Sequence, residues 1–158
     1  MTDKTRLLPF EDGDWDTLYA YMEPLWRHTY AFLPPEQVTL LLNRYFSPEG
    51  IHHYRDECGY RYFKVVDGGT VGVVVIRSDD DEVYLDKLYL REDARGQGYA
   101  AFVFGELAKY GKPIALNVNR RNENAVRCYR KNGFTVEREE EIVLENGMVN
   151  CDYRMVKR

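Results

Sequence analysis

One stretch of this chain constrains its fold most: an alternating strand pattern that runs straight into a glycine-rich loop and an apolar helix. Residues 81–92, DEVYLDKLYLRE, alternate apolar and polar side chains as a half-buried strand does. The loop ARGQGYA follows at residues 94–100, and apolar side chains then recur at helical spacing. Gly96 and Gly98 permit backbone conformations and close approaches that a Cβ atom would forbid. The pattern predicts a strand, a loop and a helix, and it indicates that a ligand or another segment approaches the backbone of the loop closely.

A helix that begins at this loop is expected to present an anion site. The first N–H groups of a helix have no partner inside it, and the helix dipole adds positive charge at this end. The P-loop pattern does not fit, because no Gly-Lys-Ser/Thr follows, and the dinucleotide fingerprint lacks its third glycine. On these residues alone, an ordinary strand-to-helix turn is the alternative.

The remaining patterns predict a mixed, mostly antiparallel sheet of six to seven strands in the α/β (α+β) class, with helices on both faces. Asp14 is expected to cap the first helix, and Pro24 to kink or split it. The expected elements are a strand at 5–11, helices at 14–33 and 34–46, a hairpin at 60–78, a strand at 81–92, a helix at 98–110, a strand at 112–119, a helix at 121–133, and a terminal hairpin at 134–158 that turns at 146–147.

Composition narrows the class of protein. The 158 residues are typical of one domain spanning 1–158, without a membrane span, and the charged start of the chain predicts a cytoplasmic protein. The three cysteines lack metal-ligand spacing, so reduced thiols and no metal are expected. A net charge of −4 argues against nucleic acid as a partner. The acidic runs 79–82 and 137–141 are interpreted as solvated, or alternatively as a rim that attracts a cationic substrate.

A second motif follows downstream. Asn122, Ala125, Tyr129, Gly133 and Phe134 fall at the spacing N-x-x-A-x-x-x-Y-x-x-x-G-F, and the alanine and tyrosine share one helical face. With the loop RGQGYA in the form Q/R-x-x-G-x-G/A, the sequence resembles the GCN5-related N-acetyltransferases, the GNAT superfamily. The resemblance covers roughly residues 60–158, and over the first 60 residues it rests only on the order of elements.

The resemblance implies the GNAT fold, in which the strand before the loop splays from its neighbour, and acetyl-CoA as co-substrate. Asn122 would contact the pantetheine arm, and Tyr129 would be the general acid for the CoA sulfur. Backbone groups of the splayed strand would pair with the pantetheine amides, and those of the loop would bind the pyrophosphate. These groups belong to Leu88, Tyr89 and Leu90, and to Arg95, Gly96, Gln97, Gly98, Tyr99 and Ala100.

The implied reaction is direct acetyl transfer to a primary amine, but the general base stays open. Some family members that modify ribosomal proteins carry Glu where this chain has Asn117, which cannot accept a proton. Glu82, Asp86, His28 and an ordered water are the alternatives. Cys128 is interpreted as a small buried residue rather than a nucleophile.

The substrate site is expected among the N-terminal helices and the last hairpin. Trp26, His28, Tyr30 and Phe32 lie close in sequence. We expect Trp26 and Phe32 to pack in the core, with a cation–π box of these aromatic residues for an ammonium group as the alternative. Similar helix pairs occur in bacterial polyamine acetyltransferases, so a small-molecule amine is the expected substrate. A protein or peptide acceptor and a non-catalytic acyl-CoA-binding module are the alternatives. A homodimer through the terminal hairpin is also expected.

Overall fold

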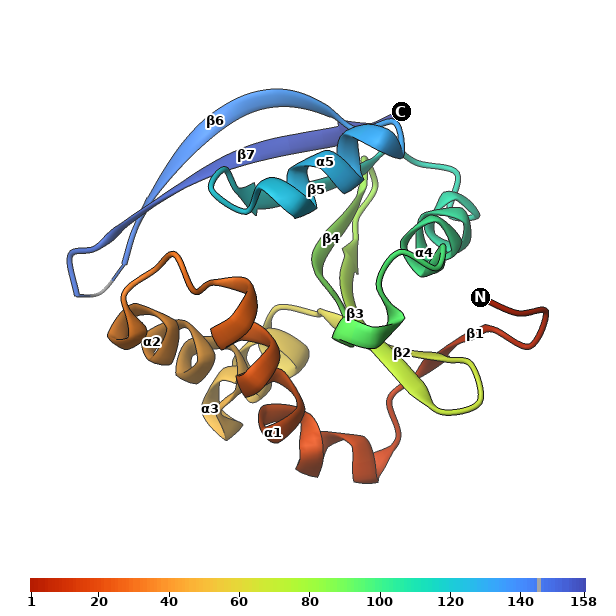
Figure 1. Cartoon of the computed structure of the whole chain (residues 1–158), viewed down its shortest axis with the longest axis horizontal. Helices are drawn as coiled ribbons and strands as arrows, with labels where there is room; N and C mark the ends of the chain where they lie inside the picture. Colours follow the sequence, from red (N-terminus) through yellow and green to blue (C-terminus); the bar gives the residue numbers. More distant parts are fainter. Residues whose placement is uncertain (145) are drawn as a thin grey trace.

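The computed structural model describes residues 1–144 and 146–158, and its strands form one seven-stranded sheet covered by helices (Figure 1). The strands are β1 (Arg6–Pro9), β2 (Arg61–Val66), β3 (Thr70–Ser78), β4 (Val83–Leu90), β5 (Ile114–Asn119), β6 (Thr135–Val143) and β7 (Val149–Lys157). The α-helices are α1 (Asp12–Thr29), α2 (Pro35–Phe46), α3 (Pro48–Ile51), α4 (Tyr99–Ala108) and α5 (Glu123–Lys131), with a π-helical turn η1 (His52–Glu57) and a 3₁₀ turn η2 (Glu92–Ala94).

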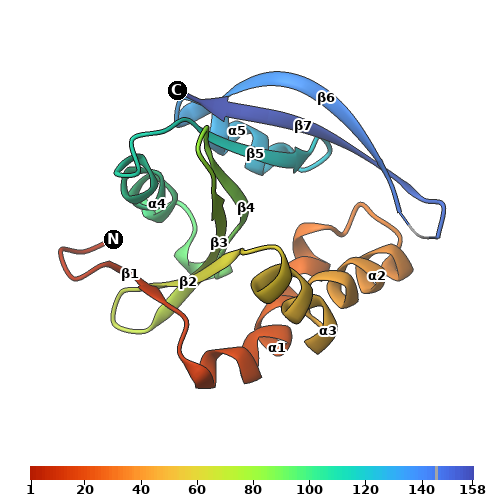
Figure 2. The same cartoon turned by 180° about the vertical axis from the view of Figure 1, so that it is seen from behind.

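The sheet is mostly antiparallel, as predicted, and runs β1-β2-β3-β4-β5-β7-β6. The parallel pair is β4 and β5, which are joined through η2 and the crossover helix α4. These two strands pair only over Val83–Leu85 and Ile114–Leu116, and then diverge (Figures 1 and 2). The register therefore confirms the predicted splayed strand pair.

Each face of the sheet has its own apolar core. Helices α4 and α5 pack on one face, where Val103, Phe104 and Phe134 are buried. Helices α1 and α2 pack on the other face, around Trp26 and Leu42. Strand β3 is buried on both faces, which explains its nearly unbroken apolar run, VGVVVI.

The first helix differs from its prediction. It begins after Glu11, and Asp14 lies one turn inside, where its carboxylate accepts the Glu11 N–H at 2.8 Å. Asp14 is therefore part of a capping box and not the N-cap. The helix also continues through Pro24, so it is not split there. Proline removes one hydrogen bond, but the buried residues Met22 and Trp26 on either side anchor the helix to the core.

The sequence patterns did not predict the structure of residues 48–57, which form α3 and the π-helical turn η1. Ser47 caps α3, because its hydroxyl accepts the Gly50 N–H at 3.1 Å. A Cβ atom on Gly50 would lie 2.3 Å from the Arg44 carbonyl oxygen, so only glycine allows this tight corner after α2. In the described ranges of the chain, no helix has both the length and the apolar character to cross a membrane.

Candidate functional site

The two diverging strands open a cleft of about 880 Å³, a volume typical of ligand sites. It is bounded by the end of α1, by β4 and β5, by the glycine loop and by α5. Most of the residues predicted for the site line this cleft. These are Leu88, Tyr89, Leu90, Arg95, Gly96, Gly98, Tyr99, Ala100, Asn122 and Tyr129.

The glycine loop forms the end of the cleft where α4 begins. Gly96 and Gly98 have φ values of +75° and +90°, in the left-handed region that favours glycine. Gly98 is the N-cap of α4 and has no side chain to bond the first-turn N–H groups. Those donors and the helix dipole therefore favour an anion here. Gln97 does not line the cleft, because its amide turns away and donates to the Asp93 carbonyl at 2.7 Å.

Strand β4 presents a free edge to the cleft. Pairing with β5 ends at Leu85, so within the described chain no strand covers residues 86–90 on that side. Free N–H and C=O groups on a strand edge can pair with an extended ligand as an added strand would. Asn122 faces the same cleft from the start of α5, where its side-chain oxygen accepts the Ala125 N–H at 3.4 Å.

Tyr129 lies in α5 with its ring packed against aromatic neighbours. The ring centre is 6.0 Å from that of Phe104 and 5.6 Å from that of Phe134. No other residue in the described ranges forms a hydrogen bond with its hydroxyl, and burial raises the pKa of that hydroxyl above its ordinary value. The group is therefore a protonated donor at neutral pH. Burial also raises the pKa of the neighbouring Cys128 thiol, which suits a packing role better than that of a nucleophile.

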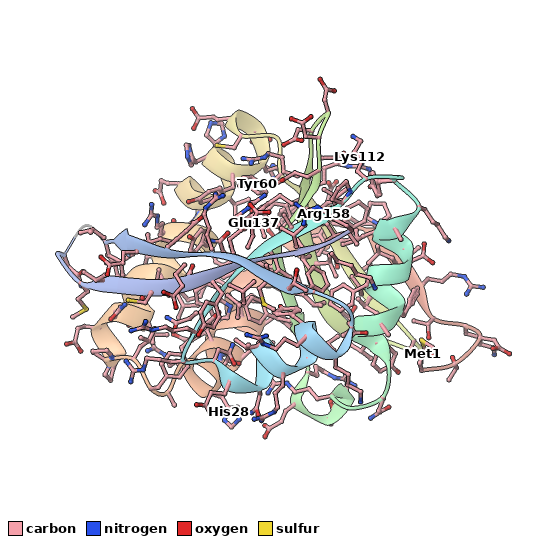
Figure 3. The ribbon with its side chains drawn as sticks, turned by 90° about the horizontal axis from the view of Figure 1, so that it is seen from above. Met1, His28, Tyr60, Lys112, Glu137 and Arg158 are labelled. Carbon is pink, nitrogen blue, oxygen red and sulfur yellow. The ribbon has the colours of Figure 1, made fainter. Side chains whose placement is uncertain are left out.

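The three candidate bases from the sequence lie in different surroundings. Glu82 lies outside the cleft, and its carboxylate bonds Arg154 at 2.6 Å. Asp86 lines the cleft but is 2.5 Å from the ammonium of Lys87. His28 also lines the cleft, with 62% of its side chain exposed, and Figure 3 shows it at the margin of the molecule.

A β-bulge shapes this part of β4. Val75 pairs with Lys87 and Ile76 pairs with Leu85, so Asp86 is an extra residue in the strand. The bulge turns Lys87 towards α1 and α2, where its side chain is almost fully buried. A lysine at this position was not anticipated as part of the site.

Aromatic side chains of α1 and α2 surround the ammonium of Lys87. It lies 3.6 Å from the ring centre of Tyr45, 5.8 Å from that of Phe46 and 5.9 Å from that of Trp26. Trp26 itself is buried in the core, as the first interpretation of the aromatic cluster predicted. Of the residues predicted for an aromatic box, only Trp26 contacts this cation, which belongs to the protein itself.

A polar group lies on the α1 and α2 side of the splay. The Tyr84 hydroxyl donates to the Asn117 side-chain oxygen at 3.1 Å, and the Asn117 amide donates to Glu140 at 2.9 Å. Asp152 in β7 lies opposite Glu140 in register. Burial raises the pKa of Asp152 to about 6, and the Glu140 charge adds to this while the Asn117 amide opposes it. Sequence reasoning missed Asp152, which stands alone in a terminal strand with no motif around it.

In both acidic runs, carboxylates form hydrogen bonds or ion pairs with nearby groups of the protein. Asp79 accepts the backbone N–H groups of Asp81 and Glu82 at 2.9 Å each, which closes the turn between β3 and β4. Glu137 lies within ion-pair distance of Arg138, Arg154 and Arg158. These contacts agree with a solvated turn and a solvated strand. Among residues 1–144 and 146–158, no group of three or more metal-ligating side chains could hold a metal ion.

Solved structures with this fold include two acetyltransferases. The PaiA N-acetyltransferase of Thermoplasma acidophilum, in complex with coenzyme A, aligns over 100% of this chain and 99% of its own, with a TM-score of 0.73 and 20% identity. The spermidine N-acetyltransferase of Vibrio cholerae, in complex with CoA and spermine, aligns over 98% of this chain and 95% of its own, with a TM-score of 0.69 and 20% identity. At these identities the likeness shows the fold.

Sequence relatives agree with the fold. Uncharacterized N-acetyltransferases of Mycobacterium tuberculosis and Mycobacterium bovis are 41% identical over 76 residues, which is 44% of this chain. The chain spans about half the length of these relatives, 49% of each. The model of the acetyltransferase (GNAT) family matches residues 15–134, which include the glycine loop and the Tyr129 motif. The chain therefore belongs to the acetyltransferase (GNAT) family.

Proposed function

We propose that this chain is an acetyl-CoA-dependent N-acetyltransferase that moves the acetyl group directly to the primary amine of a small molecule. The observation that carries the proposal is the cleft between β4 and β5, which has an anion site at one end and a protonated tyrosine in its wall. Acetyl-CoA supplies an activated thioester and a pyrophosphate, and the cleft has a matching feature for each.

The cleft residues fit acetyl-CoA in three respects. The first-turn N–H groups of α4, which follow Gly98, would bind the pyrophosphate. Backbone groups of Leu88 and Leu90 on the free edge of β4 would bond the pantetheine amides. Asn122, at the start of α5, would contact the same arm from the opposite wall.

Tyr129 would act as the general acid. Its buried hydroxyl keeps its proton at neutral pH and has no competing hydrogen bond in the described chain. In this position it would donate that proton to the sulfur as the C–S bond breaks. General acid or base catalysis by one positioned side chain contributes typically about 10²- to 10⁴-fold.

The acceptor side is the space between α1, α2 and the β6–β7 hairpin. The contacts that close this space favour a small acceptor over a peptide. The amide of Gln37 in α2 donates to Asn150 in β7 at 2.5 Å, and Gln37 is buried. Leu144, after β6, packs into the core of α1 and α2. Figure 2 shows the β6–β7 hairpin extending across towards α2. These contacts leave little room for an extended chain between the hairpin and the helices.

The charge on the acceptor side favours an amine. Asp86 and Asp152 both raise the pKa values of tyrosines from three elements, so both carboxylates act on the same space. Lys87 balances the charge of Asp86, and the remaining charge of Asp152 makes this tyrosine-lined space attractive to an ammonium group. The Vibrio cholerae protein that shares the fold is a spermidine N-acetyltransferase, and this agrees with a small amine as the acceptor here.

The test is thiol release from acetyl-CoA in the presence of polyamines, amino acids, aminoglycosides and short peptides. We expect release with a small primary amine, strong reduction in Tyr129→Phe, and loss of acetyl-CoA binding in Gly98→Glu. Release with peptides alone would instead identify a protein or peptide acetyltransferase. Tight acetyl-CoA binding without turnover, and without an effect of Tyr129→Phe, would identify a binding module.

The homodimer and the cytoplasmic location stay predictions. Val143 and Val149 face each other across β6 and β7 with 68% and 49% of their surface exposed. Exposed apolar side chains at a hairpin end support a contact between two copies. Light scattering of the wild type and of Val143→Lys measures the oligomeric state.

A further inference from the structure

Asp152 is a carboxylate on the acceptor side that no cation neutralises. In the described ranges, no lysine, arginine or histidine lies within ion-pair distance of it. Its nearest carboxylate, Glu140 on β6, differs in this respect, because Glu140 bonds Arg138 at 2.8 Å and Asn117 at 2.9 Å. Asp152 therefore stands out as a half-buried carboxylate with proton-accepting capacity.

The position of Asp152 follows from the strand order. Strand β7 lies between β5 and β6, and Asp152 faces Asn119 on one side and Glu140 on the other. Asn117, two residues before Asn119 on the same face of β5, lines the cleft just beyond the point where β4 and β5 part. The sheet thus places Asp152 next to Asn117, which lines the cleft, although Asp152 itself does not.

The electrostatic environment connects Asp152 with the cleft. Its charge raises the pKa of Tyr30, whose side chain lines the cleft, and also the pKa values of Tyr45 and Tyr84. The ionisable groups on this face come from α1, α2, β3, β4, β6 and β7. They include Tyr30, Tyr45, Arg77, Tyr84, Asp86, Lys87, Tyr89, Arg138, Glu140 and Arg154.

The other carboxylates near the cleft are already paired. Lys87 neutralises Asp86 at 2.5 Å, and Arg154 neutralises Glu82 at 2.6 Å. In each pair a carboxylate oxygen is already occupied by a cation of the protein, so neither group is free to accept a proton from the substrate. His28 is largely exposed and lies 3.6 Å from Glu92, at the outer margin of the cleft.

We propose that Asp152 takes the proton from the acceptor ammonium group, directly or across one water molecule, so that the amine becomes nucleophilic. This assignment rests on the proposed function. The neutral nitrogen then forms the C–N bond to the acetyl carbon while the C–S bond breaks. The sulfur takes the proton of the Tyr129 hydroxyl, the second nitrogen proton restores Tyr129, and Asp152 releases its proton to solvent.

The burial of Asp152 supports the assignment. A general base works best when its pKa lies near the working pH. Burial raises the pKa of Asp152 to about 6, so at pH 7 the carboxylate is mostly ionised and yet more basic than an exposed aspartate.

The experiment compares Asp152→Asn and Asp152→Glu with Glu141→Gln, using the amine that the wild type acetylates best. Glu141 is an exposed neighbour on the opposite face of the hairpin, so its substitution makes the same charge change outside the acceptor side. We expect Asp152→Asn to keep acetyl-CoA affinity and, at pH 7, to melt at a higher temperature than the wild type, because the substitution removes a half-buried charge. Its kcat/KM at pH 7 should fall by about 10²-fold or more, and its pH profile should lose the rise near pH 6.

The outcomes separate this proposal from the one on which it rests. Partial recovery in Asp152→Glu, with wild-type behaviour in Glu141→Gln, supports the assignment. An Asp152→Asn enzyme with the wild-type rate and an unchanged pH profile overturns it while leaving the acetyltransferase intact. A wild type that binds acetyl-CoA and acetylates no amine overturns the proposed function, and the assignment of Asp152 fails with it.

Discussion

The ammonium of Lys87 lies 3.6 Å from the centre of the Tyr45 ring. It also lies 2.5 Å from a carboxylate oxygen of Asp86, the preceding residue in the chain. Adjacent residues of a regular strand point to opposite faces, so this pairing depends on the bulge at Asp86. This cation lies where β4 and β5 stop pairing. Its contacts with a carboxylate of β4 and an aromatic ring of α2 anchor the strand to the helix.

Lys87→Met should destabilise the protein, because it leaves Asp86 mostly buried without its cation. Breaking a buried ion pair on one side costs roughly 3 kcal/mol or more, and urea unfolding measures it. The double variant Lys87→Met with Asp86→Asn should recover most of that loss, because no unpaired charge remains. Equal destabilisation of the single and double variants would contradict this account.

Gly98→Ala should weaken acetyl-CoA binding and lower stability. Its φ of +90° strains any residue with a Cβ atom by about 1–2 kcal/mol, and relief of the strain would turn the first N–H groups of α4. Gly105→Ala is the matched control in the same helix, at an exposed position with open space around it. That change should raise stability by about 0.5–1 kcal/mol and leave binding unchanged, as measured by calorimetry.

Tyr129→Phe should slow turnover about 10²-fold or more while leaving stability and acetyl-CoA affinity near wild type. The ring contacts with Phe104 and Phe134 survive the change, and the hydroxyl has no hydrogen bond in the described chain to lose. Tyr19→Phe removes a hydroxyl that bonds Asn43 on the helical surface, and its turnover should be unchanged. Similar slowing in both variants would argue against a specific role for Tyr129.

Local patterns predicted the elements of the second half of the chain and the glycine loop. These signals are all short-range. Alternation before Gly96 corresponds to β4, helical spacing after Gly98 corresponds to α4, and Gly133 follows the end of α5. The helix that continues through Pro24 shows where tertiary packing overrides a local signal.

Features that depend on pairing could not be predicted in this way. One extra residue at Asp86 leaves the alternation on either side intact, and strict alternation from Leu85 would send Lys87 to the face of α4. The surroundings of Asp152 depend on β7 inserting between β5 and β6, which the order of elements along the chain does not specify. The cage around Lys87 and the proposed base both come from such long-range pairings.

Asp152 should make stability depend on pH in a direction opposite to that of an ion-paired carboxylate. Its folded-state pKa of about 6 exceeds its ordinary value of 3.8, so the folded state binds the proton more tightly than the unfolded state. The stabilisation is present below pH 4 and is lost as the pH rises towards 6. Since one pKa unit corresponds to about 1.4 kcal/mol, Asp152→Asn should be more stable than the wild type by up to about 3 kcal/mol at pH 8. Urea unfolding from pH 4 to 8 measures this difference, which should shrink towards zero at pH 4, whereas Glu141→Gln should show no comparable trend. A constant difference across that range would mean that Asp152 titrates like an exposed aspartate.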